Sequence, residues 1–287
     1  TRSNKRRHYI MVKKSVNEMS FLDHLEDLRW HLIRATSAVI IVASLAYTFS
    51  KHLFEKIIFA PKQMSFPTYE YLCKAGNFIG IESTFCAEEM PLILQNRTMA
   101  GQFSADIWTS ILAGFIIAFP YVIYQFWKFI SPGMHPNERK HSKGFIIISS
   151  LLFFLGVLFG YYIITPLSIN FLANYSISTL VDNQIDIGSF IGLVRSAALA
   201  SGLVFELPII IYFLTKIGLV TPEFLKKYRK YALVIVLILS AIITPPDIAS
   251  QIIVAIPIII LYQVSIYISK MVIKSQKKKE AKHVKSS

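Results

Sequence analysis

Few residues of this sequence have the chemistry of a catalytic or metal-binding centre. Among 287 residues there are only 17 Asp and Glu and only two Cys, and 16% of the chain is charged. The sequence contains no Walker motif, nucleophile elbow, HExxH motif or paired-cysteine metal site. None of its seven histidines lies inside a long apolar run, which argues against haem held within a membrane. We therefore predict no enzyme activity, no metal site and no cofactor.

The sequence also lacks the polar balance of a soluble domain. Hydrophobic residues make up 54% of the chain and the mean hydropathy is +0.51, whereas soluble domains contain roughly 45–50% apolar residues. Most of the apolar residues form runs long enough to cross about 30 Å of hydrocarbon. These runs predict an all-α polytopic membrane protein of six helices, with approximate bounds 20–49, 107–130, 145–166, 190–214, 232–244 and 248–268.

The first and last of these predicted helices differ from the others. Residues 20–32 carry apolar and acidic side chains at helical spacing. This predicts an amphipathic start at the membrane surface that leads into the first span, and not a cleaved signal peptide. The run 232–244 has only 13 residues, about 20 Å of helix, which is shorter than the bilayer core. The last two helices are therefore expected to form a short hairpin that thins the membrane locally.

Lysine and arginine are concentrated in alternate polar segments. The segments that hold 23 of the 30 are 1–34, 131–144, 215–231 and 269–287. The intervening segments 50–106, 167–188 and 245–248 hold five. By the positive-inside rule, this bias predicts a basic cytoplasmic tail over 1–19, a membrane domain over 20–270 and a second basic cytoplasmic tail over 271–287. The net charge of +13 is thus assigned to anionic lipid headgroups of the bilayer and not to nucleic acid.

The segment 50–106 is the one large segment predicted on the outside, and its apolar residues predict an ordered cap. It contains both cysteines, Cys73 and Cys86. In an oxidising compartment these residues can form a disulfide. The sequence alone also leaves open the alternative of two unpaired thiols.

One carboxylate is placed inside a predicted membrane helix. Glu206 lies in the motif Gly202-Leu-Val-Phe-Glu-Leu-Pro208, where an acid costs on the order of 2.5–3.5 kcal/mol on insertion scales. Such a residue is a candidate functional site, and the alternative is a neutral, hydrogen-bonded structural side chain. Pro208 frees a backbone carbonyl four residues earlier, which predicts a kink beside the acid. Arg195 lies about three turns away, too far to be a direct partner.

Three further carboxylates lie in basic surroundings on the predicted cytoplasmic side. Glu138 comes directly before Arg139 and Lys140, whereas Glu26 and Asp27 lie on the polar face of the first helix. Each carboxylate alone fits a solvated surface charge. Together they fit a surface that binds guanidinium groups in bidentate fashion, which a lysine ammonium cannot reproduce.

Six short motifs, in a fixed order, carry a resemblance to a known family. They are Phe21-Leu-Asp-His-Leu-Glu-Asp-Leu-Arg29, Ala60-Pro61, Pro120-Tyr-Val-Ile-Tyr-Gln-Phe-Trp-Lys-Phe-Ile-Ser-Pro132-Gly133, Glu138-Arg139-Lys140, Phe205-Glu206-Leu-Pro208, and Thr244-Pro-Pro-Asp247 with Ser250-Gln251. In this order and on this topology, the sequence resembles the TatC family, the polytopic core subunit of the twin-arginine protein translocase. The resemblance covers about residues 20–270.

The resemblance implies a cup-like helical bundle with a concave face, located in the bacterial inner membrane. It also implies that twin-arginine signal peptides of folded proteins bind on the cytoplasmic side. The family's two binding carboxylates map to Glu138 and to a residue of the N-terminal motif, Asp27 or Glu26. The basic position of that motif maps to Arg29, and His31 stands where many family members have a second arginine.

The resemblance further implies a face for partner subunits. Single-span subunits of the TatA and TatB type would dock there, with self-association in a larger complex and a proton gradient as the energy source. The residues that map to the concave face and its edge are Glu206, Gln125, Thr244 and Gln251. Those that map to structural positions are Pro61, Pro120, Pro208 and Asp247.

Two other classes of membrane protein compete with this interpretation. A secondary transporter would use Glu206 as an intramembrane substrate or proton site, but the sequence has no internal repeat. A membrane-bound haem protein would need a pair of histidines inside its spans, which this sequence does not have. The predicted function is therefore that of a translocase subunit.

Overall fold

The computed structural model describes residues 21–79, 84–87, 89–131, 142–178, 180, 183–244 and 248–286. Within these residues, five helical stretches are long and apolar enough to cross a membrane: Leu25–Thr48, Gly101–Ile130, Gly144–Asn174, Ile187–Lys216 and Ser250–Lys278. A further helix, α11 (Arg229–Ile243), has 15 residues, about 22 Å of helix, and is shorter than the bilayer core. The chain is an all-α polytopic membrane protein.

The helices of the bundle follow one another along the chain with short connections. They are α1 (Phe21–Thr48), α4 (Gly101–Ile130), α6 (Ser142–Phe159), η6 (Gly160–Ile164), α7 (Thr165–Asn174), α8 (Ile187–Phe205), α9 (Leu207–Lys216), α10 (Pro222–Lys227), α11, and α12 (Ile248–Ser286). A cap at one end of the bundle contains α2 (Ser50–Leu53), η2 (Phe54–Ile58), η3 (Ala60–Lys62), α3 (Pro67–Ile79), η4 (Thr84–Cys86), β1 (Ile93–Gln95) and β2 (Gln184–Asp186).

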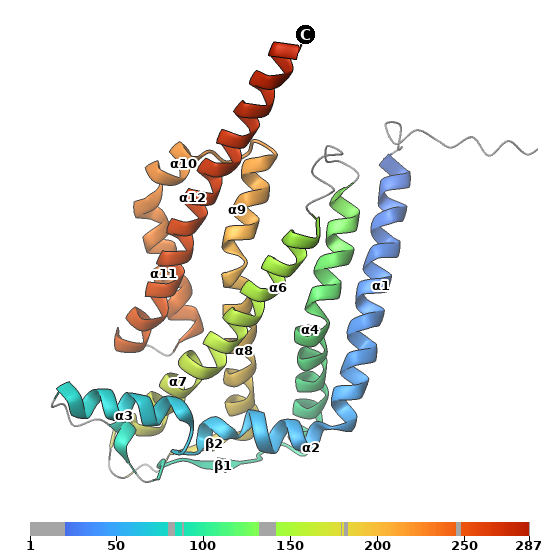
Figure 1. The fold of residues 1–287 in the computed structure, drawn as a ribbon. Coiled ribbons are helices and arrows are strands. Elements are labelled where there is room, and N and C mark those ends of the chain that lie inside the picture. The colour runs from blue at the N-terminus through green and yellow to red at the C-terminus, as the bar shows by residue number, and fades with distance from the viewer. Residues whose placement is uncertain are drawn as a thin grey trace, which may run out of the picture.

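The helices form an open row and not a closed ring. α1 packs against α4, α4 packs against α6 and α8, α9 packs against α12, and α12 packs against α11. Figure 1 shows α1 and α11 at opposite ends of this row, with the column of α6 and α7 running diagonally between them. The cap elements α2 and α3 lie across the bottom of the view. This arrangement is the cup-like bundle that the family resemblance implies.

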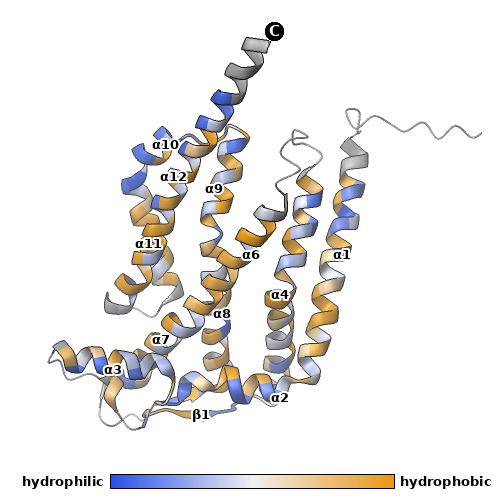
Figure 2. Cartoon of the chain, in the orientation of Figure 1, coloured by the Kyte–Doolittle hydropathy of each residue, from blue (hydrophilic) through white to orange (hydrophobic). Residues whose placement is uncertain are grey.

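Apolar side chains cover the lipid-facing surface of the helices as well as the contacts between them (Figure 2). On α1, for example, Leu32 and Ile41 are each 62% exposed and Leu45 is 58% exposed. A surface of this kind is unfavourable in water, but it matches the hydrocarbon of a bilayer. Polar residues gather instead around the cap and around α10, at the two ends of the bundle.

Small residues allow α6 and α8 to approach closely. A Cβ atom added to Gly156 would lie 2.6 Å from the backbone oxygen of Ser201. The hydroxyl of Ser201 donates a 2.6 Å hydrogen bond to the backbone oxygen of Gly156. Close packing of backbones through glycine and serine is the usual way for helices to associate in a membrane, where burial of apolar surface gives no driving force.

The cap is seated on the bundle through an apolar cluster. Ile58 and Leu92 of the cap region pack with Ala105 of α4 and with Ile191 and Val194 of α8, and all five are buried. β1 and β2 add a short parallel pair in which Leu94 is opposite Ile185. The outside segment is thus an ordered cap, as its apolar residues predict.

Within the cap, α3 is held by polar contacts and by a disulfide. The hydroxyl of Tyr69 is fully buried and donates to the backbone oxygens of Pro61, at 2.8 Å, and Pro166, at 3.3 Å. Burial raises the pKa of Tyr69, so this hydroxyl keeps its proton. Cys73 and Cys86 form a disulfide that ties α3 to η4. The cap therefore connects to the column of α6 and α7 through a fixed helix.

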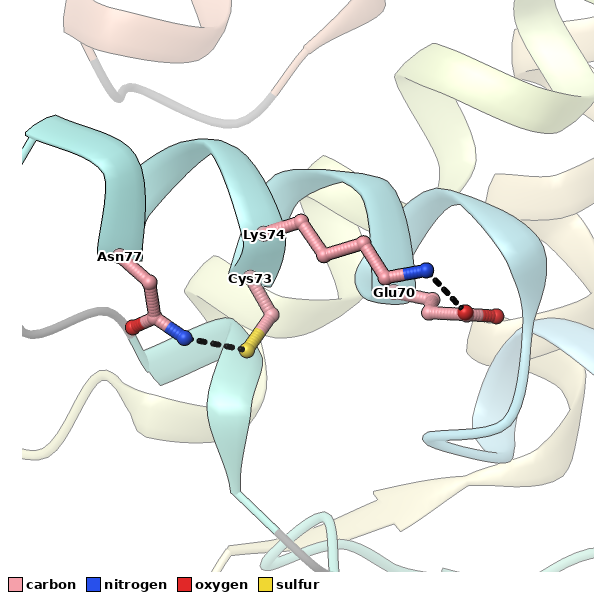
Figure 3. A network of polar contacts seen from close by, with 4 residues as sticks. All are labelled: Glu70, Cys73, Lys74 and Asn77. Carbon is pink, nitrogen blue, oxygen red and sulfur yellow. Dashed lines mark hydrogen bonds and ion pairs between the residues drawn. The ribbon is translucent and has the colours of Figure 1, made fainter.

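The exposed face of α3 carries a small polar network, shown in Figure 3. Lys74 forms an ion pair with Glu70 at 2.6 Å, one turn apart. Their hydrogen bond lowers the pKa of Glu70 and raises the pKa of Lys74. Asn77 Nδ2 lies 3.8 Å from Cys73 Sγ on the same face. Both pairs follow the four-residue spacing of helix neighbours.

Three helix bounds differ from those expected from the apolar runs. α4 begins at Gly101 and not at 107, α6–α7 continues to Asn174 and not to 166, and α12 extends to Ser286 and not to 268. Apolar runs mark only the part of a helix that lies in hydrocarbon, whereas Lys, Gln and Ala also extend helices into water. In α12, Gln276 Nε2 donates to the backbone oxygen of Lys216 at 3.1 Å, which holds part of this extension against the end of α9.

Candidate functional site

A side-chain hydrogen bond joins the start of α1 to the end of α4. Nδ1 of His31 lies 2.8 Å from Oε1 of Gln125. Gln125 is buried, with 4% of its surface exposed, and lies five residues before α4 ends at Ile130. Because a carbonyl oxygen accepts, the imidazole N–H is the donor. The N-terminal part of α1 is therefore the neighbour of the C-terminal part of α4.

The carboxylates of α1 lie at this junction. Asp27 is four residues before His31, so the two residues share a helix face. Asp27 is half-buried, whereas Glu26 and Arg29 are exposed. Of the two neighbouring acids, Asp27 is thus the one on the side of α4, and Glu26 lies more than a quarter turn away from that face.

Glu138 lies outside the described residues, but the helix ends on either side of it are described. α4 ends at Ile130 and α6 begins at Ser142. Figure 1 shows both of these ends at the same end of the bundle as the start of α1. The connection that contains Glu138 therefore joins two helix ends beside the helix that carries Asp27.

Glu206 lies between α8 and α9, where the helix is interrupted. It is the last flanking residue of α8 and the first of α9, and Pro208 follows in the first turn of α9. Its side chain is 7% exposed, and the hydroxyl of Ser149 on α6 donates to its Oε2 at 2.8 Å. Its Oε1 is buried and has no hydrogen-bond partner among the described residues. The interruption lies where Pro208 predicts it, because this proline removes a backbone donor.

The residues at the α11–α12 turn use their polar groups inside the hairpin. Thr244 is buried, and its hydroxyl donates to the backbone oxygen of Ser240 at 2.8 Å. Nε2 of Gln251, in the first turn of α12, donates to the backbone oxygen of Leu237 at 3.0 Å. These bonds fix the hairpin geometry, while Asp247 lies outside the described residues.

The remaining prolines have different local roles. Pro61 is buried, and its carbonyl accepts from the Tyr69 hydroxyl. Pro120 lies inside α4, which continues through it. Neighbouring helices and local adjustment of the backbone make such a proline acceptable in a membrane helix.

The sequence analysis missed two polar side chains at these sites. Ser149 is fully buried beside Glu206, and its only sequence signal is a hydroxyl within an apolar run. Tyr69 was expected only as an apolar residue of the cap, yet its hydroxyl joins two backbone carbonyls. Both roles depend on contacts between residues more than 50 positions apart, as for Tyr69 and Pro166.

The chemistry available at these places is that of binding. In the part of the chain that the structure describes, no group of three His, Cys, Asp or Glu residues is placed to hold a metal ion. Carboxylates and amides at helix junctions can accept and donate hydrogen bonds to a protein or peptide ligand.

Comparison with known proteins places the chain in a family. Residues 23–257 match the family model of the Sec-independent protein translocase protein (TatC). The chain belongs to the TatC family. The TatC protein of Blattabacterium sp. subsp. Periplaneta americana (strain BPLAN) is 45% identical over 266 residues, which cover 92% of this chain and 100% of that protein. The TatC protein of Aquifex aeolicus (strain VF5) is 35% identical over 263 residues, covering 91% of this chain and 98% of that protein.

Solved TatC structures have the same fold. A crystal structure of the twin arginine translocase receptor TatC superposes with a TM-score of 0.65 at 33% identity, covering 87% of this chain and 99% of that one. A second structure of that receptor, in DDM, gives a TM-score of 0.67 at 34% identity and covers 86% of this chain.

Family membership confirms three predictions made from the sequence. The chain is a TatC-family protein, its fold is the polytopic helical bundle of that family, and it is a translocase subunit and not an enzyme. The family does not favour the secondary transporter that was the alternative for Glu206.

Proposed function

We propose that this chain is the signal-peptide receptor and core subunit of a twin-arginine translocase in the bacterial inner membrane, with both termini in the cytoplasm. The solved relatives are described as twin arginine translocase receptors. The concentration of 23 of the 30 Lys and Arg in alternate segments supports this orientation. Folded proteins with twin-arginine signal peptides are the proposed cargo, and a proton gradient is the proposed energy source.

The observation that carries this proposal is the hydrogen bond between His31 and Gln125. It holds the face of α1 that carries Asp27 against the end of α4, eight residues before Glu138 in the sequence. We assign the two arginines of the signal peptide to Asp27 and Glu138. Each carboxylate can accept a planar, bidentate pair of N–H donors from a guanidinium group.

The exposed neighbours of Asp27 belong to the same proposed surface. Glu26 is a second carboxylate within reach of the peptide, on a different face of α1. Arg29 is exposed two residues after Asp27 and offsets the negative charge of this part of the helix. In the proposal, Asp27 makes the direct contact because it faces α4.

We assign the partner subunits to a second surface. The buried Oε1 of Glu206, which has no partner among the described residues, is an acceptor for a donor from a single-span subunit of TatA or TatB type. The α11–α12 hairpin with Thr244 and Gln251 is the proposed edge of this surface. Copies of the chain would associate in the same complex.

Peptide binding to the detergent-solubilised full chain tests the receptor function. A twin-arginine signal peptide should bind the wild type, and a twin-lysine peptide of otherwise identical sequence should bind at least about tenfold more weakly. Glu138→Gln should lose binding of the arginine peptide. Glu223→Gln is the matched control, because it removes a carboxylate of the basic segment 215–231 that the proposal does not use. Equal binding of both peptides, unchanged in Glu138→Gln, would refute the receptor function.

A further inference from the structure

A mostly apolar groove opens between the cap and the bundle, away from the surfaces assigned above. It has a volume of about 400 Å³ and is lined by residues of η2, α4, η6 and α8 and by the end of α6. The apolar part of its wall consists of Leu112, Ile116, Ile117, Val157, Leu158 and Val194. These residues belong to helices that cross the membrane. The groove is therefore open to the acyl chains of a bilayer.

Two cationic side chains line this groove, and no carboxylate does. They are Arg195 on α8 and Lys56 on η2. Neither forms an ion pair within the described residues, where the ion pair found is that of Glu70 with Lys74. Cations next to hydrocarbon are costly unless they are paired with an anion. The groove thus has positive charge without a counter-ion from the described chain.

A buried hydroxyl in the same wall also has no partner. Thr109 is 2% exposed, and its Oγ1 makes no hydrogen bond to any described residue. Thr109 lines the groove together with Arg195. A buried polar atom without a partner loses about 1–3 kcal/mol, so a ligand that accepts a hydrogen bond from it would remove this cost.

The depth of these groups is that of a lipid headgroup and its first carbons. Thr109 and Arg195 each lie eight residues from the cap-side start of their helices, Gly101 and Ile187, which is about 12 Å along the helix axis. Tyr161 lines the groove as well, and its hydroxyl donates to the backbone oxygen of Ile57 at 2.7 Å. Tyrosine is typical of the interface between membrane and water.

We infer that this groove binds one anionic phospholipid from the leaflet on the cap side, whose phosphate pairs with Arg195 and Lys56 while an acyl chain lies along α4 and α6. Arg195 is suited to this task because a guanidinium group presents two parallel donors to phosphate oxygens. The Thr109 hydroxyl is the third donor. This site is separate from the proposed peptide and partner surfaces and does not depend on them.

The size of the groove argues against a transmembrane helix as its occupant. One turn of a helix about 10 Å wide and 5.4 Å long fills about 420 Å³, which is the whole volume of the groove. An acyl chain is thinner and can leave this space through the open side into the bilayer. A single lipid therefore fits, whereas a second span would contact the groove with only a few side chains.

Native mass spectrometry of the full chain in detergent, titrated with phosphatidylglycerol, tests this site. The wild type should retain one tightly bound lipid, and Arg195→Gln should weaken that binding about tenfold. Arg195→Lys should recover part of the affinity, because it restores the charge but not the bidentate geometry. Lys51→Gln is the matched control, since Lys51 lies on α2 five residues before Lys56 and does not line the groove.

A second variant tests the acyl-chain part without changing charge. Ala113 lines the groove on α4, and Ala113→Phe should fill the space and displace the lipid while leaving the melting temperature of the lipid-free protein within a few degrees. The proposal is overturned if Arg195→Gln and Lys51→Gln retain lipid equally. It is also overturned if diacylglycerol, which lacks phosphate, or inorganic phosphate alone occupies the site as well as phosphatidylglycerol does. Cross-linking of a signal peptide to a photoreactive residue at 113 would identify the groove as a peptide site and overturn it too.

Discussion

The hydroxyl of Ser149 donates a 2.8 Å hydrogen bond to Oε2 of Glu206, across the contact between α6 and the α8–α9 junction. Both side chains are buried, and the other carboxylate oxygen of Glu206 has no partner within the described residues. Half of the hydrogen-bonding capacity of this acid thus stabilises the bundle, and half is available to a ligand. The two interpretations of Glu206 as structural and as functional therefore apply to different oxygens of one side chain.

Ser149→Ala should destabilise the protein by about 1–3 kcal/mol, because it leaves Oε2 of Glu206 buried without its donor. Thermal unfolding in detergent measures this effect. Ser150→Ala is the control, since Ser150 is also buried but its hydroxyl has no partner among the described residues. Equal losses of stability in the two variants would contradict a specific role for the Ser149 bond.

The bond between His31 and Gln125 should appear as a coupling energy of about 0.5–1.5 kcal/mol in a double-mutant cycle. The cycle consists of His31→Ala, Gln125→Ala and the double variant, each measured by unfolding in detergent. A coupling of zero within error would mean that α1 is held to α4 by apolar packing alone. In that case the position of Asp27 would not depend on this pair.

Of the two neighbouring acids on α1, Asp27 should matter more for binding of a twin-arginine peptide. Asp27→Asn should weaken binding about tenfold or more, since it removes a charge-assisted hydrogen bond. Glu26→Gln removes the same charge from the exposed side of the helix and should change binding less than about threefold. Isothermal titration calorimetry compares the two variants directly, and the reverse order would assign the contact to Glu26.

Gly156→Ala should destabilise the bundle by about 1–3 kcal/mol through overpacking. The added Cβ would lie 2.6 Å from the backbone of Ser201 and force α6 away from α8. Gly144→Ala on the same helix meets no atom within 4 Å, so it should stabilise the helix by up to about 1 kcal/mol. Melting temperatures that shift in opposite directions would support this packing, and a shift of the same sign and size would argue against it.

The sequence predicts the apolar part of each membrane helix well, since the bilayer imposes both length and composition on it. It also predicts the interruption at Glu206, because Pro208 removes a specific backbone donor. The helix ends beyond the hydrocarbon were harder to predict. The column of α6 and α7 passes through Pro166, which sits in the first turn of α7 after the π-helical segment η6, where a missing N–H costs little.

The pairs that build the candidate sites are beyond the reach of sequence patterns. His31 and Gln125 are 94 positions apart, and Ser149 and Glu206 are 57 apart. Periodicity places each residue on a face of its own helix, but it does not say which faces meet. The groove with Arg195 was missed for the same reason, because Lys56 and Thr109 join it from separate elements.

The extension of α12 gives one end of the bundle a shape that a flat membrane surface does not have. After the contact between Gln276 and Lys216, ten residues continue as helix to Ser286, about 15 Å at 1.5 Å per residue. Figure 1 shows this segment rising beyond the ends of the other helices. A bulky folded domain brought to this end of the bundle would meet a narrow rod before it met the bilayer, so its angle of approach is restricted on the side of α12 and open on the side of α1.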